Sequence, residues 1–92
     1  MELTRRSRPF WWEWEFVLSD HILDRMADRD FTEIDLRAML GGVIEMSHDI
    51  VAGRWLIRAR LRTRPWEVII EPIHDERIVL VITAYPARRA DR

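Results

Sequence analysis

The chain has 92 residues, a formal net charge of −1 and 48% hydrophobic residues. A chain of this length forms one domain with one core, and the composition is that of a folded protein rather than a disordered one. Cysteine is absent, which excludes disulfides and thiolate chemistry. The near-neutral charge argues against a generic nucleic-acid binder, which is usually basic overall.

We expect a single domain over residues 10–86, with flexible tails at 1–9 and 87–92. Both ends are short, polar and rich in arginine, which is typical of frayed termini. No apolar run approaches the roughly 20 residues that span a bilayer. We therefore expect a cytoplasmic protein that does not bind a membrane.

The segment 12–18 alternates between apolar and polar residues in the manner of a half-buried strand. Trp12, Trp14, Phe16 and Leu18 share one side, and glutamates occupy part of the other. An alternation with period two predicts a β-strand with one face against the core.

Helical periodicity follows, and it predicts two short helices. Ser19 is placed to cap a helix over residues 20–29. Thr32, followed three residues later by Asp35, forms a capping box for a second helix that ends near residue 40. Asp30 makes the turn between them in a left-handed conformation that glycine or asparagine adopts with less strain.

The sequence from residue 43 onward predicts four strands, near residues 43–48, 54–62, 66–72 and 77–85. Their short connections predict that neighbours in the chain pair as antiparallel strands. A two-residue turn at 63–64 would place Leu61 opposite Trp66 and Arg60 opposite Glu67. One face of this hairpin is then apolar, and the helices should cover it. The predicted fold is α+β, with two N-terminal helices packed on one face of a sheet of four or five antiparallel strands.

Two groups of basic residues are candidates for a functional site. Arg58, Arg60 and Arg62 alternate along one strand, so their side chains lie about 7 Å apart on one face, a spacing close to that of successive phosphates in extended RNA. His21, Arg25 and Arg29 recur every fourth residue and form a stripe beside the apolar face of the first helix. The alternative interpretation of both groups is ion pairing with nearby acids, as on ordinary solvated surfaces.

Other features are less informative about chemistry. Trp11 and Tyr85 lie at predicted strand ends, where an aromatic ring could stack on a base. His21, His48 and His74 match no zinc spacing, and the chain has no glycine-rich phosphate loop. We expect no metal and no cofactor.

Several segments together resemble a bacterial domain family of unknown function that is grouped with the RelE/ParE-like toxins. The resemblance covers residues 15–86, and its most specific pieces are the pattern Ser19-x-His21-x-x-x-Arg25-Met26-x-x-Arg29 and the final Thr83-Ala84-Tyr85. Such sequences usually have alanine where this chain has Ile22, and glycine where it has Asp30.

The resemblance implies a RelE-like fold and a metal-independent endoribonuclease of a toxin–antitoxin pair. In that interpretation His21 serves as general acid or base, because its ordinary pKa lies near neutral pH. Arg25 assists it at the catalytic site, and Tyr85 positions or stacks a base. The phosphate-binding residues are then Arg29, Arg58, Arg60 and Arg62. The implied partners are a cognate antitoxin and messenger RNA, either free or on the ribosome.

Two alternatives use the same residues without catalysis. The chain could be a protein-interaction module, directed to gyrase or to another partner, or a homodimer built on the aromatic segment around Trp11 and Trp12. It could also be a plain RNA- or DNA-binding domain whose arginines hold phosphates. The sequence leaves all three functions open.

Overall fold

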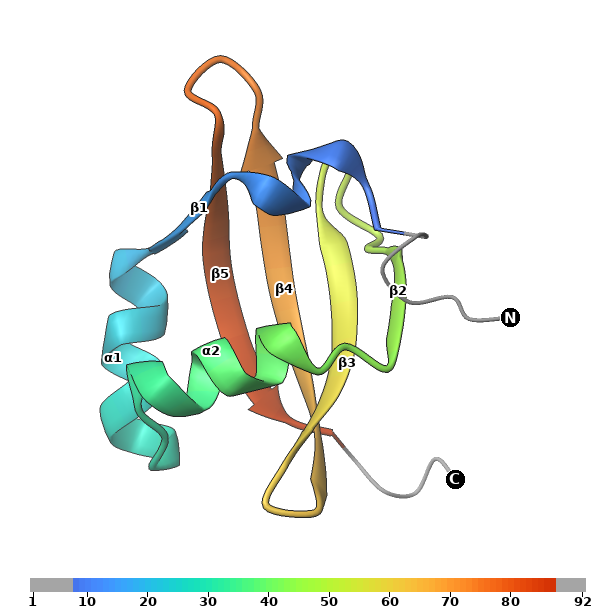
Figure 1. Cartoon of the computed structure of the whole chain (residues 1–92). Coiled ribbons are helices and arrows are strands. Elements are labelled where there is room, and N and C mark those ends of the chain that lie inside the picture. Colours follow the sequence, from blue (N-terminus) through green and yellow to red (C-terminus); the bar gives the residue numbers. More distant parts are fainter. Residues whose placement is uncertain (1–7, 88–92) are drawn as a thin grey trace.

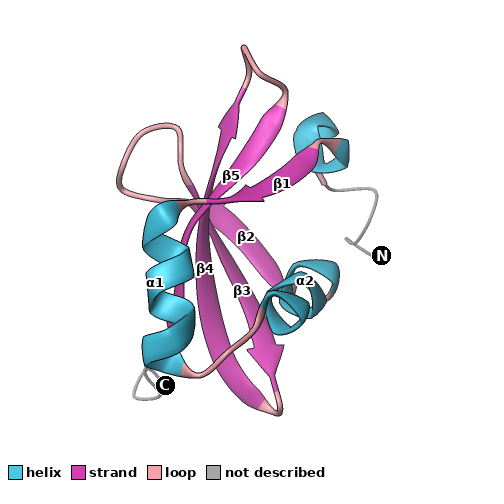
Figure 2. Cartoon of the chain, turned by 90° about the vertical axis from the view of Figure 1, so that its left-hand side faces the viewer, coloured by secondary structure: helices cyan, strands magenta, loops and turns pink. Residues whose placement is uncertain are grey.

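The computed structural model describes residues 8–87, which form a five-stranded sheet with two helices on one of its faces (Figures 1 and 2). In chain order the elements are the 3₁₀ helix η2 (Phe10–Glu13), β1 (Glu15–Leu18), α1 (Asp20–Arg29), α2 (Glu33–Gly41), β2 (Glu45–His48), β3 (Trp55–Leu61), β4 (Arg64–Ile73) and β5 (Ile78–Pro86). The strand order is β1-β5-β4-β3-β2. The predicted α+β class is confirmed. Neither α1 nor α2 is long and apolar enough to cross a membrane, and the described residues contain no other helix that could.

The sheet is mixed rather than fully antiparallel. β1 runs parallel to β5, with Phe16 opposite Val79 and Leu18 opposite Val81, whereas the other neighbouring strands are antiparallel. The expectation of an antiparallel sheet is therefore wrong at this edge. A short hairpin produces antiparallel neighbours, but β1 and β5 are far apart in the chain and meet only through tertiary packing.

The aromatic segment before β1 is a 3₁₀ helix, so the predicted strand over residues 12–18 is wrong in its first half. Trp11 is 4% exposed, and its ring centroid lies 5.7 Å from that of Trp55. The compact turn of η2 allows this large ring to enter the core, and its burial outweighs the local preference for an extended strand. Phe16 and Leu18 pack against the core, as their alternation predicts.

Both helices begin at the predicted caps. The Ser19 hydroxyl accepts a hydrogen bond from the main-chain N–H of Ile22 at 3.1 Å. At the start of α2, Thr32 and Asp35 form the reciprocal capping box. Asp30 ends α1 in the left-handed conformation, with φ of 57° and ψ of 55°. These local predictions are confirmed.

The core lies between the helices and one face of the sheet. On β3, buried Ile57, Ala59 and Leu61 alternate with exposed Arg58 and Arg60. The buried residues of β4 and β5 complete this inner face, and Ile22, Leu36 and Met39 cover it from the helices. In the described chain no helix lies across the opposite face of the sheet, which we call the open face; Figure 2 shows α2 on the inner side and α1 beside the β5 edge.

The β3–β4 hairpin has a different register from the one predicted. Its turn is Arg62-Thr63, not residues 63–64, so Leu61 faces Arg64 and Ala59 faces Trp66. Both turn residues have positive φ, 51° and 69°, as a two-residue turn with the twist of a hairpin requires. Neither is glycine or asparagine, so the sequence carries no turn signal here. The shift moves each partner by two residues and leaves every side chain on its predicted face.

Candidate functional site

An open groove of about 1120 Å³ lies at the end of the sheet formed by the β3–β4 hairpin. Its apolar lining includes Ile44, Pro65, Trp66 and Pro86, and its charged lining is Arg58, Arg60, Arg62, Arg64, Glu45 and Glu67. Four arginines against two glutamates make this region basic, although the chain as a whole carries a net charge of −1. We call it the arginine groove.

The four arginines of the groove differ in how far they are neutralised. Arg58 contacts two carboxylates, Glu45 at 3.3 Å and Glu67 at 3.6 Å. Arg62 pairs with Asp35 of α2 at 3.2 Å. Arg60 and Arg64 are exposed and form no ion pair within residues 8–87. These two arginines therefore carry the positive charge that the groove offers to a ligand.

A row of polar side chains crosses four strands of the open face and borders the groove. Glu45 on β2 lies opposite Arg58, Arg58 opposite Glu67, and Glu67 opposite Tyr85 on β5. The Glu67 carboxylate contacts Arg58 and also lies beside Tyr85, whose pKa it raises. The predicted pair of Arg60 with Glu67 is wrong, because the observed register brings Arg58 to Glu67 and places Pro65 opposite Arg60.

Tyr85 is held in its neutral form. Burial is the main cause that raises the pKa of its phenol to about 12, and the neighbouring negative Glu67 carboxylate contributes to the same rise. The positive charge of Arg29 opposes the rise only in part. At neutral pH Tyr85 is therefore a hydrogen-bond donor and not a base.

The stripe on α1 divides into residues with different roles. Arg29 donates a hydrogen bond to the main-chain oxygen of Ala84 at 2.9 Å, so it is held against β5. Arg25 pairs with Asp28, one turn along the same helix, at 2.6 Å. His21 is exposed. Arg29 is thus held next to Tyr85 in the chain of β5, through the neighbouring Ala84. Arg25 instead pairs with an acid on its own helix, as the alternative interpretation expects.

The structure separates His21 and Arg25 from the strand arginines. α1 packs along the edge strand β5, whereas Arg58 and Arg60 project from the open face of β3. β4 lies between β3 and β5, so the two groups are also about 10 Å apart across the sheet. Neither His21 nor Arg25 lines the groove. The seven predicted site residues therefore form one connected set of five (Arg29, Arg58, Arg60, Arg62 and Tyr85) and a separate pair on α1.

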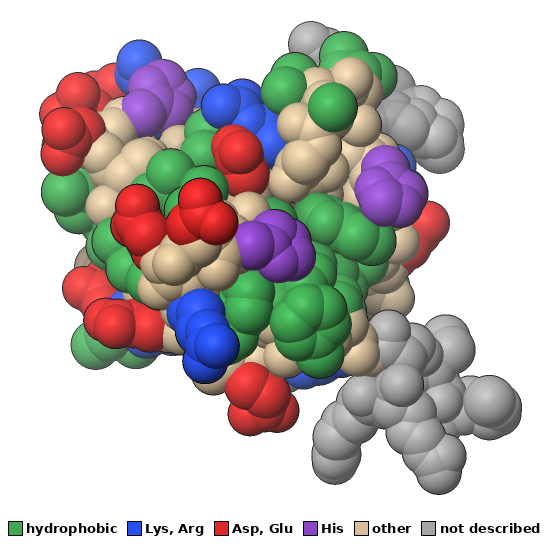
Figure 3. Space-filling model, turned by 90° about the horizontal axis from the view of Figure 1, so that it is seen from above, with side chains coloured by type: hydrophobic (Ala, Val, Ile, Leu, Met, Phe, Trp, Pro, Cys, Tyr) green, Lys and Arg blue, Asp and Glu red, His purple; other side chains and the backbone are tan. Residues whose placement is uncertain are grey.

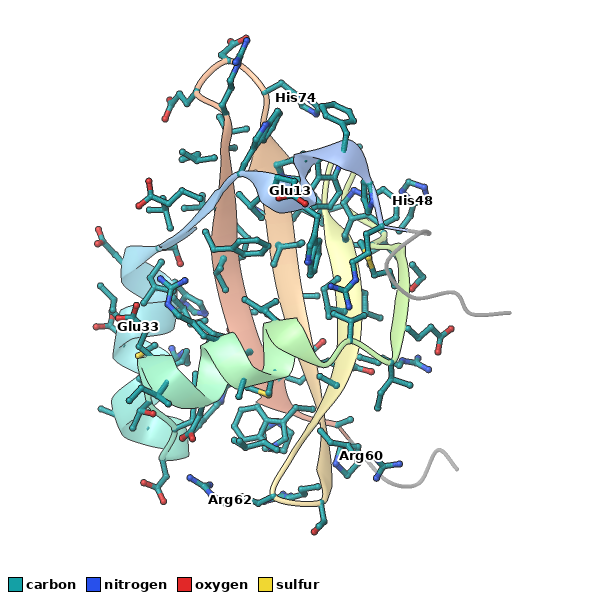
Figure 4. The ribbon with its side chains drawn as sticks, in the orientation of Figure 1. Glu13, Glu33, His48, Arg60, Arg62 and His74 are labelled. Atoms are coloured by element: carbon teal, nitrogen blue, oxygen red, sulfur yellow. The ribbon has the colours of Figure 1, made fainter. Side chains whose placement is uncertain are left out.

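The other two histidines lie at the opposite end of the molecule from the groove. Figure 4 shows His48 and His74 at one end of the sheet, with Arg60 and Arg62 at the other. The His48 ring lies 4.1 Å from that of Trp55, and the His74 ring lies 5.3 Å from that of Trp14. Hydrophobic side chains gather beside histidines at this end of the molecule (Figure 3). Within residues 8–87 no group of three or more His, Asp or Glu side chains could hold a metal ion.

Arg64 lies in β4 and not in the predicted turn at residues 63–64. The observed register places Arg64 in β4, among the residues that line the groove. The base-stacking candidate Trp11 is buried in the core, and Trp66 lines the groove instead although it is only 4% exposed. No residue pattern distinguishes a turn arginine from a strand arginine here, because the turn itself lacks the usual residues.

Comparisons of the chain with protein-family models, with curated proteins and with solved structures find no match.

Proposed function

We propose that this chain is a RelE-like, toxin-type domain that binds single-stranded RNA through the arginine groove. The observation that carries the proposal is the pair Arg60 and Arg64, two exposed guanidinium groups without an ion pair in the described chain, lining one open groove. A guanidinium fork matches the oxygens of a phosphate. On β3, Arg58 and Arg60 share one face about 7 Å apart, which suits successive phosphates of an extended strand, and Arg64, opposite Leu61 on β4, adds a guanidinium from the other face of the hairpin.

The neighbouring groups support a backbone-binding role. Arg58 and Arg62 already have carboxylate partners, so they contribute less to binding than Arg60 and Arg64. The apolar side chains of Ile44 and Pro86 provide flat surface beside the charges, against which a base or sugar can pack. The exposed arginines support a phosphate backbone as the ligand, and the resemblance to RelE-like toxins favours RNA over DNA.

Cleavage is the stronger form of this proposal. A metal-independent nuclease needs a group that removes the proton from the 2′-hydroxyl of the RNA. The carboxylate of Glu67 borders the groove, and neutral Tyr85 beside it can donate a proton or a hydrogen bond. A nuclease that used His21 and Arg25 would need RNA to pass over α1 instead. The cognate antitoxin would then be the partner that occupies whichever surface the RNA uses.

Fluorescence anisotropy with a short labelled single-stranded RNA tests binding. We expect Arg60→Ala and Arg64→Ala each to weaken binding by about tenfold at low salt. Each should also reduce the slope of the logarithm of the binding constant against the logarithm of the salt concentration by about one. Arg37→Ala is the matched control, because Arg37 is an exposed arginine on α2 that pairs with Glu33 and lies outside the groove. Equal losses in all three variants would show unspecific charge attraction and would refute the groove as the binding site.

A further inference from the structure

One ion pair connects the β3–β4 hairpin to the first turn of α2. A guanidinium N–H of Arg62 donates to Oδ2 of Asp35 at 3.2 Å. The same carboxylate oxygen accepts the main-chain N–H of Thr32 at 3.0 Å, as part of the capping box of α2. A single oxygen atom therefore serves both the helix cap and a hairpin that lies 27 residues further along the chain.

The two partners of this ion pair are held in place to different extents. The side chain of Asp35 is 19% exposed and is fixed by its helix and by the cap, whereas the side chain of Arg62 is 66% exposed at the tip of the hairpin. An exposed arginine keeps much of the freedom of its long side chain. Asp35 is thus a fixed acceptor, and Arg62 is the partner that can leave it.

The pair also draws a groove arginine toward a carboxylate that is not part of the groove. Arg58 is neutralised by Glu45 and Glu67, and both of these acids line the groove themselves. Asp35 is not among the described residues that line it. Figure 4 shows Arg60 and Arg62 on different sides of the hairpin, with Arg62 on the side of the helices. The charge of Arg62 is therefore taken up by α2 and not offered to the groove.

A phosphate is a suitable replacement for Asp35 as the partner of Arg62. An exposed ion pair of this kind contributes little to stability in water, so it can be broken at small cost. A phosphate presents several charged oxygens that match the guanidinium fork at least as well as a carboxylate does. The cost of breaking the pair is nevertheless subtracted from the free energy of ligand binding. Asp35 and the ligand therefore compete for one guanidinium group.

We propose that Asp35 is an intramolecular competitor of the ligand, which masks Arg62 in the free chain and lowers the affinity of the arginine groove. Loss of the Asp35 charge makes Arg62 a third free phosphate-binding arginine beside Arg60 and Arg64. This inference rests on the proposed function, because it describes how the affinity of the same site is set. It adds a residue of α2 to a site that is otherwise built from strands and their connections.

A double-mutant cycle on Asp35 and Arg62, measured by fluorescence anisotropy with a short labelled single-stranded RNA, tests the proposal. Asp35→Asn removes the charge, while its amide oxygen can still accept the N–H of Thr32 and so retain the cap. We expect Asp35→Asn to tighten RNA binding by about fivefold at low salt. Arg62→Ala should weaken binding by only about twofold in the unmodified protein and by about tenfold in the Asp35→Asn background.

Glu33→Gln is the matched control. It removes the same charge from the first turn of α2, but Glu33 pairs with Arg37, which lies outside the groove. We expect no tightening of RNA binding in this variant. Equal tightening by Glu33→Gln and Asp35→Asn would show a general effect of charge on RNA attraction and would overturn the proposal.

Two further outcomes would overturn it. Arg62→Ala that costs as much binding as Arg60→Ala in the unmodified protein would show that Arg62 is not masked, and this comparison needs no change at Asp35. Asp35→Asn that weakens RNA binding together with thermal stability would show that the carboxylate only supports the fold.

The experiment separates this proposal from the proposed function. If Arg60→Ala and Arg64→Ala weaken binding but Asp35→Asn does not tighten it, the RNA site stands and the competitor role of Asp35 fails. If Arg60→Ala and Arg64→Ala leave RNA binding unchanged, the RNA site fails and the competitor role fails with it.

Discussion

Arg29 on α1 donates a hydrogen bond across 2.9 Å to the main-chain oxygen of Ala84 on β5. β1 pairs with β5 only as far as Val81, so the lower half of β5 would otherwise be a free edge. The Ser19 hydroxyl donates to the oxygen of Ile82 at 3.0 Å in the same way. α1 thus closes an edge that could pair with other chains, and two residues of the pattern that carries the toxin resemblance have a structural role.

We expect Arg29→Ala to lower the free energy of unfolding by about 1–2 kcal/mol, because a charge-assisted hydrogen bond to a strand carbonyl is lost. Urea denaturation followed by tryptophan fluorescence measures the change. Arg37→Ala on α2 removes only a surface ion pair and should cost about 0.5 kcal/mol or less. If Arg29→Ala keeps full stability but loses RNA binding, Arg29 is a ligand residue and not an edge cap.

Ser19→Ala should destabilise the protein by about 1–2 kcal/mol. The hydroxyl caps α1 through the N–H of Ile22 and also donates to Ile82, so one substitution removes two hydrogen bonds. Thermal unfolding by circular dichroism measures the loss. Ser47→Ala on β2, where the serine is exposed, is the control and should unfold like the unmodified protein.

Asp30→Gly should stabilise the protein by about 1 kcal/mol. Asp30 has φ of 57°, in the left-handed region where a residue with a Cβ atom is strained and glycine is not. Asp24→Gly, in the exposed middle of α1, should instead cost about 1 kcal/mol. The opposite signs of these two changes, measured in one denaturant series, distinguish relief of strain from a general effect of glycine.

Tyr85 is the sole tyrosine of the chain, so its ionisation can be followed by absorbance without ambiguity. The phenol should titrate near pH 12, and Glu67→Gln should lower the pKa toward 10 because the carboxylate is removed. The pKa is higher in the folded than in the unfolded chain, so stability is complete below about pH 10 and falls as the pH rises to about 12. Tyr85→Phe should remove this part of the pH dependence. A titration near pH 10 in the unmodified protein would contradict both the burial of the phenol and the influence of Glu67.

His21→Ala/Arg25→Ala should leave RNA binding by the groove unchanged, because both residues lie on α1 away from it. Mapping RNA 5′ ends after expression in bacteria, at equal soluble protein levels, measures cleavage separately. Cleavage that is lost in this double variant while binding persists would place the catalytic site on α1, as the family resemblance implies. Cleavage that is lost in Glu67→Gln instead would place it at the groove.

Much of the local structure was predictable because its causes lie within a few residues. The bounds of α1, the caps at Ser19 and Thr32, and the left-handed Asp30 follow from side chains next to the backbone they affect. The apolar face of β3 followed from simple alternation. The 3₁₀ turn of η2 was not predictable, because burial of Trp11 beside Trp55 depends on a strand more than forty residues away.

The candidate site was predictable in membership but not in arrangement. Alternation alone places Arg58 and Arg60 together on one face, and this needs no tertiary information. The position of the hairpin turn decides which of the two arginines lies opposite Glu67. In the observed register, shifted by two residues from the predicted one, Arg58 and not Arg60 lies opposite Glu67, and both arginines stay on the predicted face.

The sequence by itself determined where the helices begin, which side of each strand is apolar, and that several arginines share a surface, because each of these depends on neighbours along the chain. Only the tertiary structure decided that β1 joins β5 in parallel, that Arg60 and Arg64 form no ion pair within residues 8–87, and that His21 and Arg25 lie apart from the groove. Those features depend on strand order and register, which are set by packing between segments distant in sequence and not by the segments themselves.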